Sequence, residues 1–291
     1  MGSAGFPASE SNERAAVSAS GDGPSGYEIC RRPASGRLTG LVDGIVGYRE
    51  SGHVLRLSAE MAPLVVPLII SFAEPFEIAF GRVPSPSDRY WSFTSGLYPG
   101  FVLINSYGGA ECVQIDFTPL GAYRFFGMPM SELASRIVTL DDLADRAIEE
   151  LRQRLAHEPA WERRLDMAEA FVAERIAAAR PASAEITWAY DTIRARHGDI
   201  RVRDVAASLD WSRKHLNDRF RAEVGVGPKA VARMARFNRA LDLSRHAAGE
   251  GWARIAAEAG YADQAHMVRE FRELGGITPT EVTPQLLEDR R

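Results

Sequence analysis

The sequence predicts an α+β protein in two parts, a β-rich N-terminal part that ends in two helices and an all-helical C-terminal part. Three observations indicate this organisation. The chain has 291 residues, the length of two ordinary domains. Short apolar segments between Gly, Pro and Ser fill the first half, whereas apolar residues recur at helical spacing from residue 141 onward. A helical hairpin pattern then occurs twice near the C-terminus.

The beginning of the chain and its composition exclude several classes of protein. Residues 1–26 are rich in Ala, Ser and Gly, and we expect a disordered tail there. They contain no apolar run of the kind found in secretory signals, and no stretch of the chain is apolar for long enough to span a membrane. Cys30 and Cys112 have neither metal-site spacing nor a disulfide framework. We therefore expect a cytoplasmic protein with no membrane partner.

Short apolar segments between residues 27 and 126 predict β-strands at 54–57, 64–72, 76–80, 101–105 and 112–117. Strands at this spacing are typical of a barrel or sandwich, and a closed barrel of this size holds one small ligand. Aromatic residues in a small barrel usually form its core. With that alternative open, the candidate contacts to a small-molecule effector are the polar and aromatic residues among the strands: Arg82, Tyr90, Trp91, Phe93 and Tyr107.

From residue 141 the apolar period becomes helical. Leu143, Ala147, Leu151 and Leu155 recur every four residues, and a second apolar stripe begins at Trp161, after Pro159. These patterns predict two amphipathic helices that pack on the barrel. We therefore expect a β-rich effector-binding and dimerisation domain at 27–176, a linker at 177–184, a helical domain at 185–283 and a tail at 284–291.

The second hairpin pattern lies within residues 252–282, where a stop follows it. One face of a short helix carries Ile255, Ala256 and Ala259, and Gly260 follows where a sharp turn needs positive φ. Asp263 is placed to cap the next helix. The core stripe of that helix is Met267, Phe271 and Leu274. A helical hairpin whose second helix has a polar, basic outer face is the shape that enters a DNA major groove.

The same pattern occurs earlier, at residues 205–221. Val205, Ala206 and Trp211 correspond to Ile255, Ala256 and Tyr261, and His215, Leu216, Phe220 and Arg221 correspond to His266, Met267, Phe271 and Arg272. A repeat is much stronger evidence than either copy alone. Pro228 begins the run between the copies, as expected for the first turn of a helix. About 20 residues of helix span roughly 30 Å, close to one turn of B-DNA.

Charge supports the division into two parts. Residues 1–184 hold 17 Lys and Arg against 23 Asp and Glu, whereas residues 185–291 hold 18 against 16. The basic residues concentrate at 194–245, where 13 face 6 acidic residues. A basic stretch on a doubled helical hairpin is the electrostatic signature of phosphate binding.

Both hairpins and their spacer resemble the AraC/XylS family of bacterial transcription regulators. The resemblance is carried by IAAEAGYADQAHMVREFRELGGITPTEV and by RVRDVAASLDWSRKHLNDRFRAEVGVGPKAVARMARFNRAL, within residues 184–282. It implies sequence-specific binding to double-stranded promoter DNA, usually as an activator that works with RNA polymerase. It also implies a cupin-like effector-binding barrel in the N-terminal part. The helices after the barrel are then expected to form a homodimer.

The resemblance also places base contacts on Lys214, Asn217 and Asp218, and on Gln264, Ala265 and Arg269. Lys and Arg donate to guanine, and Asn and Gln pair with adenine. Asp218 departs from the pattern, because a carboxylate accepts from cytosine but repels phosphate. Ala265 also departs and offers only a contact to a thymine methyl group. The rest of the candidate DNA-binding set is Arg213 and Arg221, which we expect on the phosphate backbone, the outward Arg272, and the caps Ser212 and Asp263.

Two pairs of residues near the recognition helices have less direct roles. His215 and His266 hold equivalent places in the two copies, which favours helix packing for both. For Arg236 and Arg239 on the spacer, phosphate contact and structural pairing both remain open.

The alternative function is a cupin-type small-molecule-binding protein or enzyme whose helical part serves assembly. Metal cupins need clustered histidines, and His53 is the only histidine before residue 150. We interpret Glu50, Glu74, Glu77 and Glu111 as solvated strand ends. No catalytic, phosphate-binding or dinucleotide-binding motif occurs, so we expect no catalytic residue, metal or cofactor. Gel shift on random DNA and metal analysis of the purified protein discriminate between the two functions.

Overall fold

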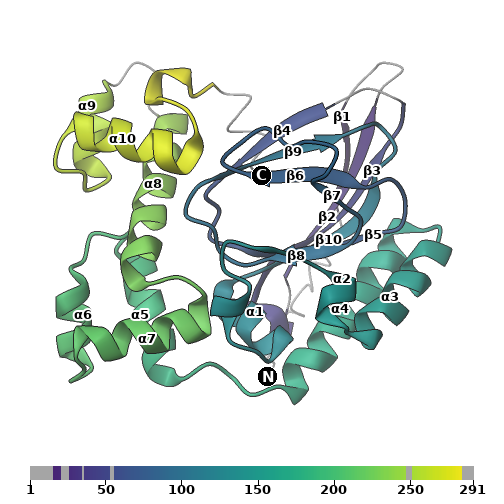
Figure 1. The fold of residues 1–291 in the computed structure, drawn as a ribbon, viewed down its shortest axis with the longest axis horizontal. Helices are drawn as coiled ribbons and strands as arrows, with labels where there is room; N and C mark the ends of the chain where they lie inside the picture. Colours follow the sequence, from purple (N-terminus) through teal and green to yellow (C-terminus); the bar gives the residue numbers. More distant parts are fainter. Residues whose placement is uncertain (1–15, 21–25, 35, 53–55, 247–250, 284–291) are drawn as a thin grey trace, which may run out of the picture.

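The predicted division into a β-rich N-terminal region and a helical C-terminal region is confirmed. The computed structural model describes residues 16–20, 26–34, 36–52, 56–246 and 251–283. Figure 1 shows two facing β-sheets, helices on the outer side of one sheet, and a separate group of helices on the other side of the molecule. No helix among these described residues is both long and apolar enough to cross a membrane.

The strands of the β-rich region form two sheets, and all of their pairings are antiparallel. The first sheet has the order β1-β2-β3-β10-β5-β8-β11 and the second has the order β4-β9-β6-β7. The first consists of β1 (Ala16–Ser20), β2 (Tyr27–Pro33), β3 (Val42–Glu50), β5 (Val66–Ser71), β8 (Phe93–Ser95), β10 (Glu111–Phe117) and β11 (Ile137–Thr139). The second consists of β4 (Arg56–Met61), β6 (Phe76–Phe80), β7 (Arg89–Tyr90) and β9 (Phe101–Ser106).

The expected strands correspond to β4, β5, β6, β9 and β10, with the bounds of β6 unchanged. Residues 54 and 55 of the first expected strand lie outside the described residues. The structure differs within residues 1–26, where β1 pairs with the free edge of β2 in the segment expected to be disordered. An unpaired strand edge offers a row of backbone donors and acceptors, which β1 satisfies. The other tail residues, 1–15, 21–25 and 284–291, lie outside the described part.

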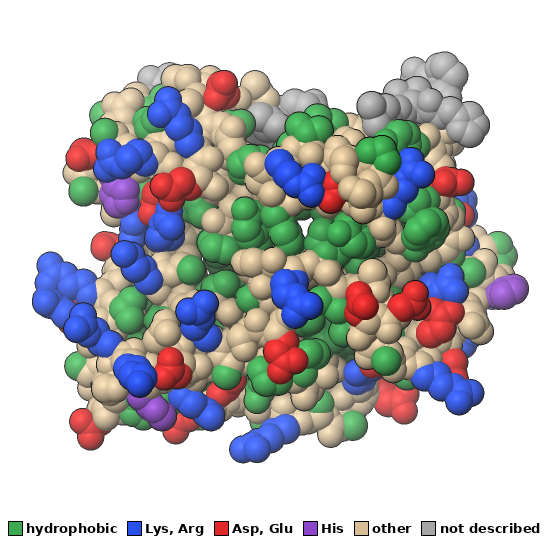
Figure 2. Space-filling model, in the orientation of Figure 1, with side chains coloured by type: hydrophobic (Ala, Val, Ile, Leu, Met, Phe, Trp, Pro, Cys, Tyr) green, Lys and Arg blue, Asp and Glu red, His purple; other side chains and the backbone are tan. Residues whose placement is uncertain are grey.

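Strand β10 shows how the two faces of the first sheet differ. Val113, Ile115 and Phe117 are fully buried in the main core, under the helices. The alternate residues Cys112, Gln114 and Asp116 face the space between the sheets, because side chains of a strand alternate between faces. Apolar side chains from both sheets line this space, namely Ile69, Phe76, Ile78 and Phe93. Figure 2 shows a hollow in this part of the molecule, bordered by hydrophobic side chains.

Two trailing helices cover the outer face of the first sheet, as predicted. They are α3 (Arg146–His157) and α4 (Trp161–Ala178), and the shorter α1 (Pro119–Phe126), η2 (Met130–Glu132) and α2 (Leu140–Leu143) precede them. The ring of Trp161 lies on Gly47 of β3, where a Cβ atom would be only 2.5 Å from the ring. Glycine at position 47 therefore sets how closely α4 approaches the sheet.

Glu50, Glu77 and Glu111 are not solvated strand ends, which corrects the expectation. Glu50 is 8% exposed and accepts hydrogen bonds from the Tyr48 hydroxyl (2.6 Å) and the backbone N of Gly108 and Ala110 (3.0 and 3.2 Å). Glu77 is 1% exposed and accepts from Arg89, Asn105 and Tyr107. Glu111 accepts from Arg49 and Arg164. These carboxylates are covered because other strands, the loop after β9 and, for Glu111, helix α4 supply their donors. The periodicity of one strand does not reveal those donors.

The C-terminal region consists of two helical hairpins on a connecting helix. Hairpin 1 is α6 (Val202–Ser208) with α7 (Arg213–Val224), and hairpin 2 is α9 (Trp252–Glu258) with α10 (Gln264–Gly275). Helix α8 (Pro228–His246) connects them, α5 (Ala184–Ala195) precedes them, and η3 (Pro279–Glu281) follows. The doubled hairpin and its spacer are thus confirmed, with Pro228 at the start of α8.

The β-rich region contacts the helical region near both ends of α8. Helix α7 packs against α1 and η2, and α10 packs against β4 and β9. Beside α10, the Asn238 amide of α8 donates to the carbonyl oxygen of Ala62 (3.2 Å). Gly276, just after α10, lies against the ring of Phe101. The two hairpins are therefore held in a defined relation by α8 on one side and by the β-rich region on the other.

Candidate nucleic-acid interface

The two recognition helices, α7 and α10, begin at the expected caps. The Ser212 hydroxyl accepts from the backbone N of His215 (3.1 Å), and the Asp263 carboxylate accepts from the backbone N of His266 (2.6 Å). These bonds satisfy donors that the first turn of a helix leaves free. The preceding turn has positive φ in both hairpins, at Gly260 (81°) and at Asp210 (56°). The repeat in the sequence is therefore a repeat of local structure.

Each hairpin also has an aromatic–histidine contact that fixes its turn. The rings of Trp211 and His215 are 4.4 Å apart, and those of Tyr261 and His266 are 5.3 Å apart, both edge to face. This supports the expected packing role of the two histidines.

The candidate residues of α7 lie on its open side. Leu216, Phe220 and Val224 are completely buried. The exposed candidates are Ser212, Arg213, Lys214, Asp218 and Arg221. Asn217 is half-buried, and its side-chain oxygen lies so close to Gly227 that a Cβ atom there would be 2.7 Å away. Lys214 and Asp218 are both exposed and lie four residues apart, so they share the open side of α7.

Helix α10 has the same division. Met267, Phe271 and Leu274 are completely buried, and the rings of Phe271 and Phe237 of α8 meet edge to face at 4.9 Å. The exposed candidates are Asp263, Gln264, Ala265, Arg269 and Arg272. Packing thus fixes one side of each recognition helix and leaves the polar side available.

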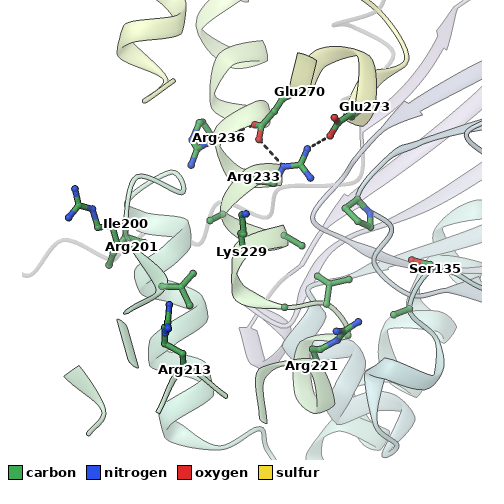
Figure 3. A pocket seen from close by; sticks show the side chains of 18 of the residues that line it. Ser135, Ile200, Arg201, Arg213, Arg221, Lys229, Arg233, Arg236, Glu270 and Glu273 are labelled. Carbon is green, nitrogen blue, oxygen red and sulfur yellow. Dashed lines mark hydrogen bonds and ion pairs between the residues drawn. The ribbon is translucent and has the colours of Figure 1, made fainter. Parts of the chain in front are cut away.

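A cavity of about 1300 Å³ lies between α7 and α10, along α8 (Figure 3). Of the candidate DNA-binding residues, Arg213 and Arg221 of α7 and Arg269 of α10 line it. Five further cations line the same cavity: Arg201, Arg203, Lys229, Arg233 and Arg236. The structure therefore joins the two recognition helices into one cationic surface, which attracts a polyanion.

Sequence reasoning missed Arg201, Arg203, Lys229 and Arg233. All four lie in the basic stretch 194–245. The excess of basic residues in that stretch indicated phosphate binding, but it did not identify which of them take part. Arg236, whose role stayed open, is engaged in structural pairing. It donates to the carbonyl oxygen of Gly198 (3.2 Å), and its guanidinium lies over the Tyr261 ring (5.5 Å).

The two carboxylates that line the cavity are both paired with Arg233. Its Nε donates to Glu270 (2.8 Å), and its Nη2 donates to Glu273 (Figure 3). Burial lowers the pKa of Arg233, but these hydrogen bonds outweigh it and raise the pKa above its ordinary value. Glu270 is 4% exposed, so this pairing also pins α10 to α8. The acidic groups of the cavity thus orient the second recognition helix and remain neutralised.

The five candidate effector contacts do not form one site. Tyr90 and Phe93 lie in the space between the sheets, with ring centroids 5.9 Å apart. Trp91 is exposed. Arg82 is paired with Asp88 in the loop after β6 (2.6 Å), and Tyr107 donates to Glu77 (2.6 Å). Each of these two side chains is therefore satisfied by a neighbour.

The space between the sheets contains polar residues that sequence reasoning missed. The Gln114 amide donates to Asp116 (2.8 Å), and Tyr48 lies opposite Cys112 on the neighbouring strand. Burial raises the pKa of Asp116 to about 6, although the bond from Gln114 opposes that shift. The alternation in residues 111–117, ECVQIDF, was the available signal, because it places Gln114 and Asp116 on one face.

Several solved structures are similar to this chain at low identity. The C-terminal domain of AraT, a response regulator from Geobacillus stearothermophilus, is 22% identical, over 38% of this chain and 88% of that chain, with a TM-score of 0.32. ToxT from Vibrio cholerae O395 is 10% identical over 89% of this chain and 96% of its own, with a TM-score of 0.42. The AraC-like transcriptional activator CuxR is 14% identical over 72% and 79%, with a TM-score of 0.31.

The sequence itself matches a family. Residues 205–285 match the family described as a helix-turn-helix domain. The match includes both recognition helices, α8 and all six candidate base-contacting residues. No curated protein matches the chain. Residues 205–285 therefore belong to this helix-turn-helix family.

Proposed function

We propose that this protein is a cytoplasmic transcription activator that binds promoter DNA through α7 and α10 under the control of a small-molecule effector. The observation that carries the proposal is the single cationic surface shared by two capped recognition helices. Helix α8 has 19 residues and spans roughly 28 Å, which suits two major-groove contacts about one turn apart. Both helices can therefore read the same face of one duplex.

The side chains on the open faces suggest what each helix reads. We propose that Lys214 and Arg269 donate to guanine and that Asn217 and Gln264 pair with adenine. Asp218 is suited to cytosine N4, and Ala265 to a thymine methyl group. Arg213, Arg221 and Arg272 bind phosphate, where they position the helices without selecting sequence.

The space between the two sheets is the proposed effector site. It combines apolar side chains with the polar Gln114 and Asp116, as small-molecule sites usually do. An effector there acts by favouring one arrangement of the hairpins over another. Dimerisation through α3 and α4 fits this arrangement, because these helices lie on the far side of the β-rich region from α7 and α10 (Figure 1). RNA polymerase is the partner that activation requires.

Selection of bound sequences from random duplex DNA tests the proposal. We expect enrichment of a site with two half-elements about one helical turn apart. A folded protein that enriches no sequence, with or without candidate effectors, contradicts sequence-specific binding.

Replacing Arg269 with alanine is expected to weaken binding to the selected site by about 1–3 kcal/mol and to relax the choice at one base pair. Arg269 is exposed on α10 and lines the cavity, so the change leaves the helix packing intact. Binding to the selected site and to its single-base variants, measured by fluorescence anisotropy, checks this result. Equal losses on specific and random DNA would assign Arg269 to the phosphate backbone.

Replacing Arg213 with alanine is expected to weaken specific and random DNA equally. Because Arg213 is the first residue of α7 and lines the cavity, we expect a phosphate contact whose loss reduces the slope of log K against log salt by about 0.9. Arg56→Ala removes the same charge at the exposed end of β4 that lies away from α10, and it serves as the control. Identical slopes for the two variants would remove Arg213 from the phosphate set.

A further inference from the structure

The cationic cavity has a second wall, which belongs to the β-rich region. Pro99, Ser131, Ala134 and Ser135 line the cavity together with the cations of the helical region. Ser131 is exposed in η2, and Figure 3 shows Ser135 at the same end of the cavity as Arg221. This wall has no carboxylate, although residues 1–184 hold 23 acidic residues against 17 basic ones. The residues that line the cavity on this side are thus uncharged and carry two hydroxyl groups, and the neighbouring Glu132, exposed in the same turn, is not among them.

The wall is attached firmly to the first recognition helix. Helix α7 packs on η2 and α1, and a Cβ atom at Gly225 would lie 3.2 Å from the carbonyl oxygen of Met130. At the end of α7, the buried carboxylate of Glu223 accepts from the backbone N (2.7 Å) and hydroxyl (3.0 Å) of Ser183, in the segment between α4 and α5. The wall and α7 therefore approach a bound duplex as one rigid unit.

Helix α7 is long enough that the DNA backbone at the edge of the groove would lie next to the wall. Its 12 residues span roughly 18 Å, which exceeds the width of about 12 Å of a B-DNA major groove. A helix of this length that enters the groove reaches the phosphates at the groove's edge. At the C-terminal end of α7, those phosphates meet Arg221 and then the wall of η2.

We propose that Ser131 and Ser135 bind DNA phosphate, so that the β-rich region is itself part of the DNA interface. Serine hydroxyl groups are regular donors to phosphate oxygens and carry no sequence information. The contact therefore adds affinity and register to α7 while leaving the choice of bases to the recognition helices. This inference rests on the proposed function, since it requires that α7 binds DNA.

Opposite charge changes at Ser131 test the inference in the full-length protein. Binding to the selected duplex and to random duplex is measured between 50 and 200 mM salt. Ser131→Arg is expected to tighten both complexes about three- to tenfold and to steepen the salt slope by about 0.9, and Ser131→Glu to weaken both. Ser51→Arg adds the same charge at an exposed serine just after β3, at the end of that strand opposite α1, and is the matched control.

Salt slopes that are the same for wild type, Ser131→Arg and Ser51→Arg would overturn the inference. Weaker binding by both Ser131 variants would also overturn it, because a wall that blocks the duplex loses affinity with either charge. Ser131 is exposed, so thermal unfolding of each variant should match the wild type and confirm that the fold is intact. Wild-type protein that binds no duplex would contradict the proposed function instead.

Discussion

Replacing Arg164 with alanine is expected to lower the free energy of unfolding of the β-rich region by about 3–4 kcal/mol. Arg164 of α4 is 4% exposed, and its Nη1 is 2.5 Å from a carboxylate oxygen of Glu111. Its Nε donates to the carbonyl oxygen of Leu155 near the end of α3 (3.0 Å). Its guanidinium lies 4.6 Å from the ring centroids of both Phe72 and Trp161. One change therefore removes an ion pair, a buried hydrogen bond and two ring contacts.

Urea unfolding followed by tryptophan fluorescence measures this loss. Burial raises the pKa of Glu111, but the hydrogen bonds from Arg164 and Arg49 outweigh burial and hold it below the ordinary value. A lowered pKa contributes stability above the unfolded pKa of about 4.3 and loses it as the pH falls through the folded pKa. The difference between Arg164→Ala and wild type should therefore shrink in acid. Arg154→Ala on exposed α3 is the control, with an expected change within about 0.5 kcal/mol, and equal losses for both would contradict the argument.

Replacing Asp116 with asparagine is expected to stabilise the protein at pH 7 by about 2–3 kcal/mol. Burial raises the pKa of this carboxyl to about 6, the neighbouring charge of Asp43 adds to the shift, and Gln114 and Arg31 oppose it. The unfolded chain has a pKa of about 3.9, so the folded protein binds the extra proton between pH 4 and 6. Stability conferred by that proton falls as the pH rises through this window.

Asparagine stays neutral at every pH and still accepts the hydrogen bond from Gln114. The substitution therefore removes the loss of stability that occurs as the pH rises. Thermal and urea unfolding of both proteins from pH 4 to 8, without ligand, should give curves that meet near pH 4 and diverge up to pH 7. Asp141→Asn on α2 removes the same charge at an exposed position and is the control, with an expected change in stability within about 0.5 kcal/mol. Parallel curves for wild type and Asp116→Asn would show that Asp116 titrates normally in the folded protein.

The DNA-binding helices were predictable because their signals are local. Each hairpin shows its signals within about 20 residues: a helix cap, a turn at glycine or aspartate, and apolar residues spaced three and four apart. The repeat of this pattern doubled the evidence. Strands β2 and β3 were missed because Arg31, Arg32, Gly44 and Gly47 interrupt their apolar pattern. The structure explains Gly47, since Trp161 occupies the place of a side chain there.

The effector candidates were less predictable because their positions depend on strand pairing. Tyr90 and Trp91 are adjacent in sequence, yet Tyr90 packs against Phe93 between the sheets and Trp91 is exposed. Tyr107 was chosen as a polar aromatic residue, but the partner that binds its hydroxyl, Glu77, lies 30 residues away on β6. Long-range register decides these contacts, and a single strand does not encode it.

The contacts of α7 and α10 with the β-rich region have a consequence for the DNA itself. A spacer of roughly 28 Å is shorter than the rise of about 34 Å for one turn of B-DNA, and the β-rich region prevents the hairpins from moving apart freely. Because both hairpins bind one duplex in the proposed function, we expect that duplex to take up this small difference of about 6 Å by curving toward the protein. The stiffness of the base pairs between the two half-elements then affects the binding affinity. Steps that bend easily, such as TA and CA, should be favoured there although no side chain contacts them.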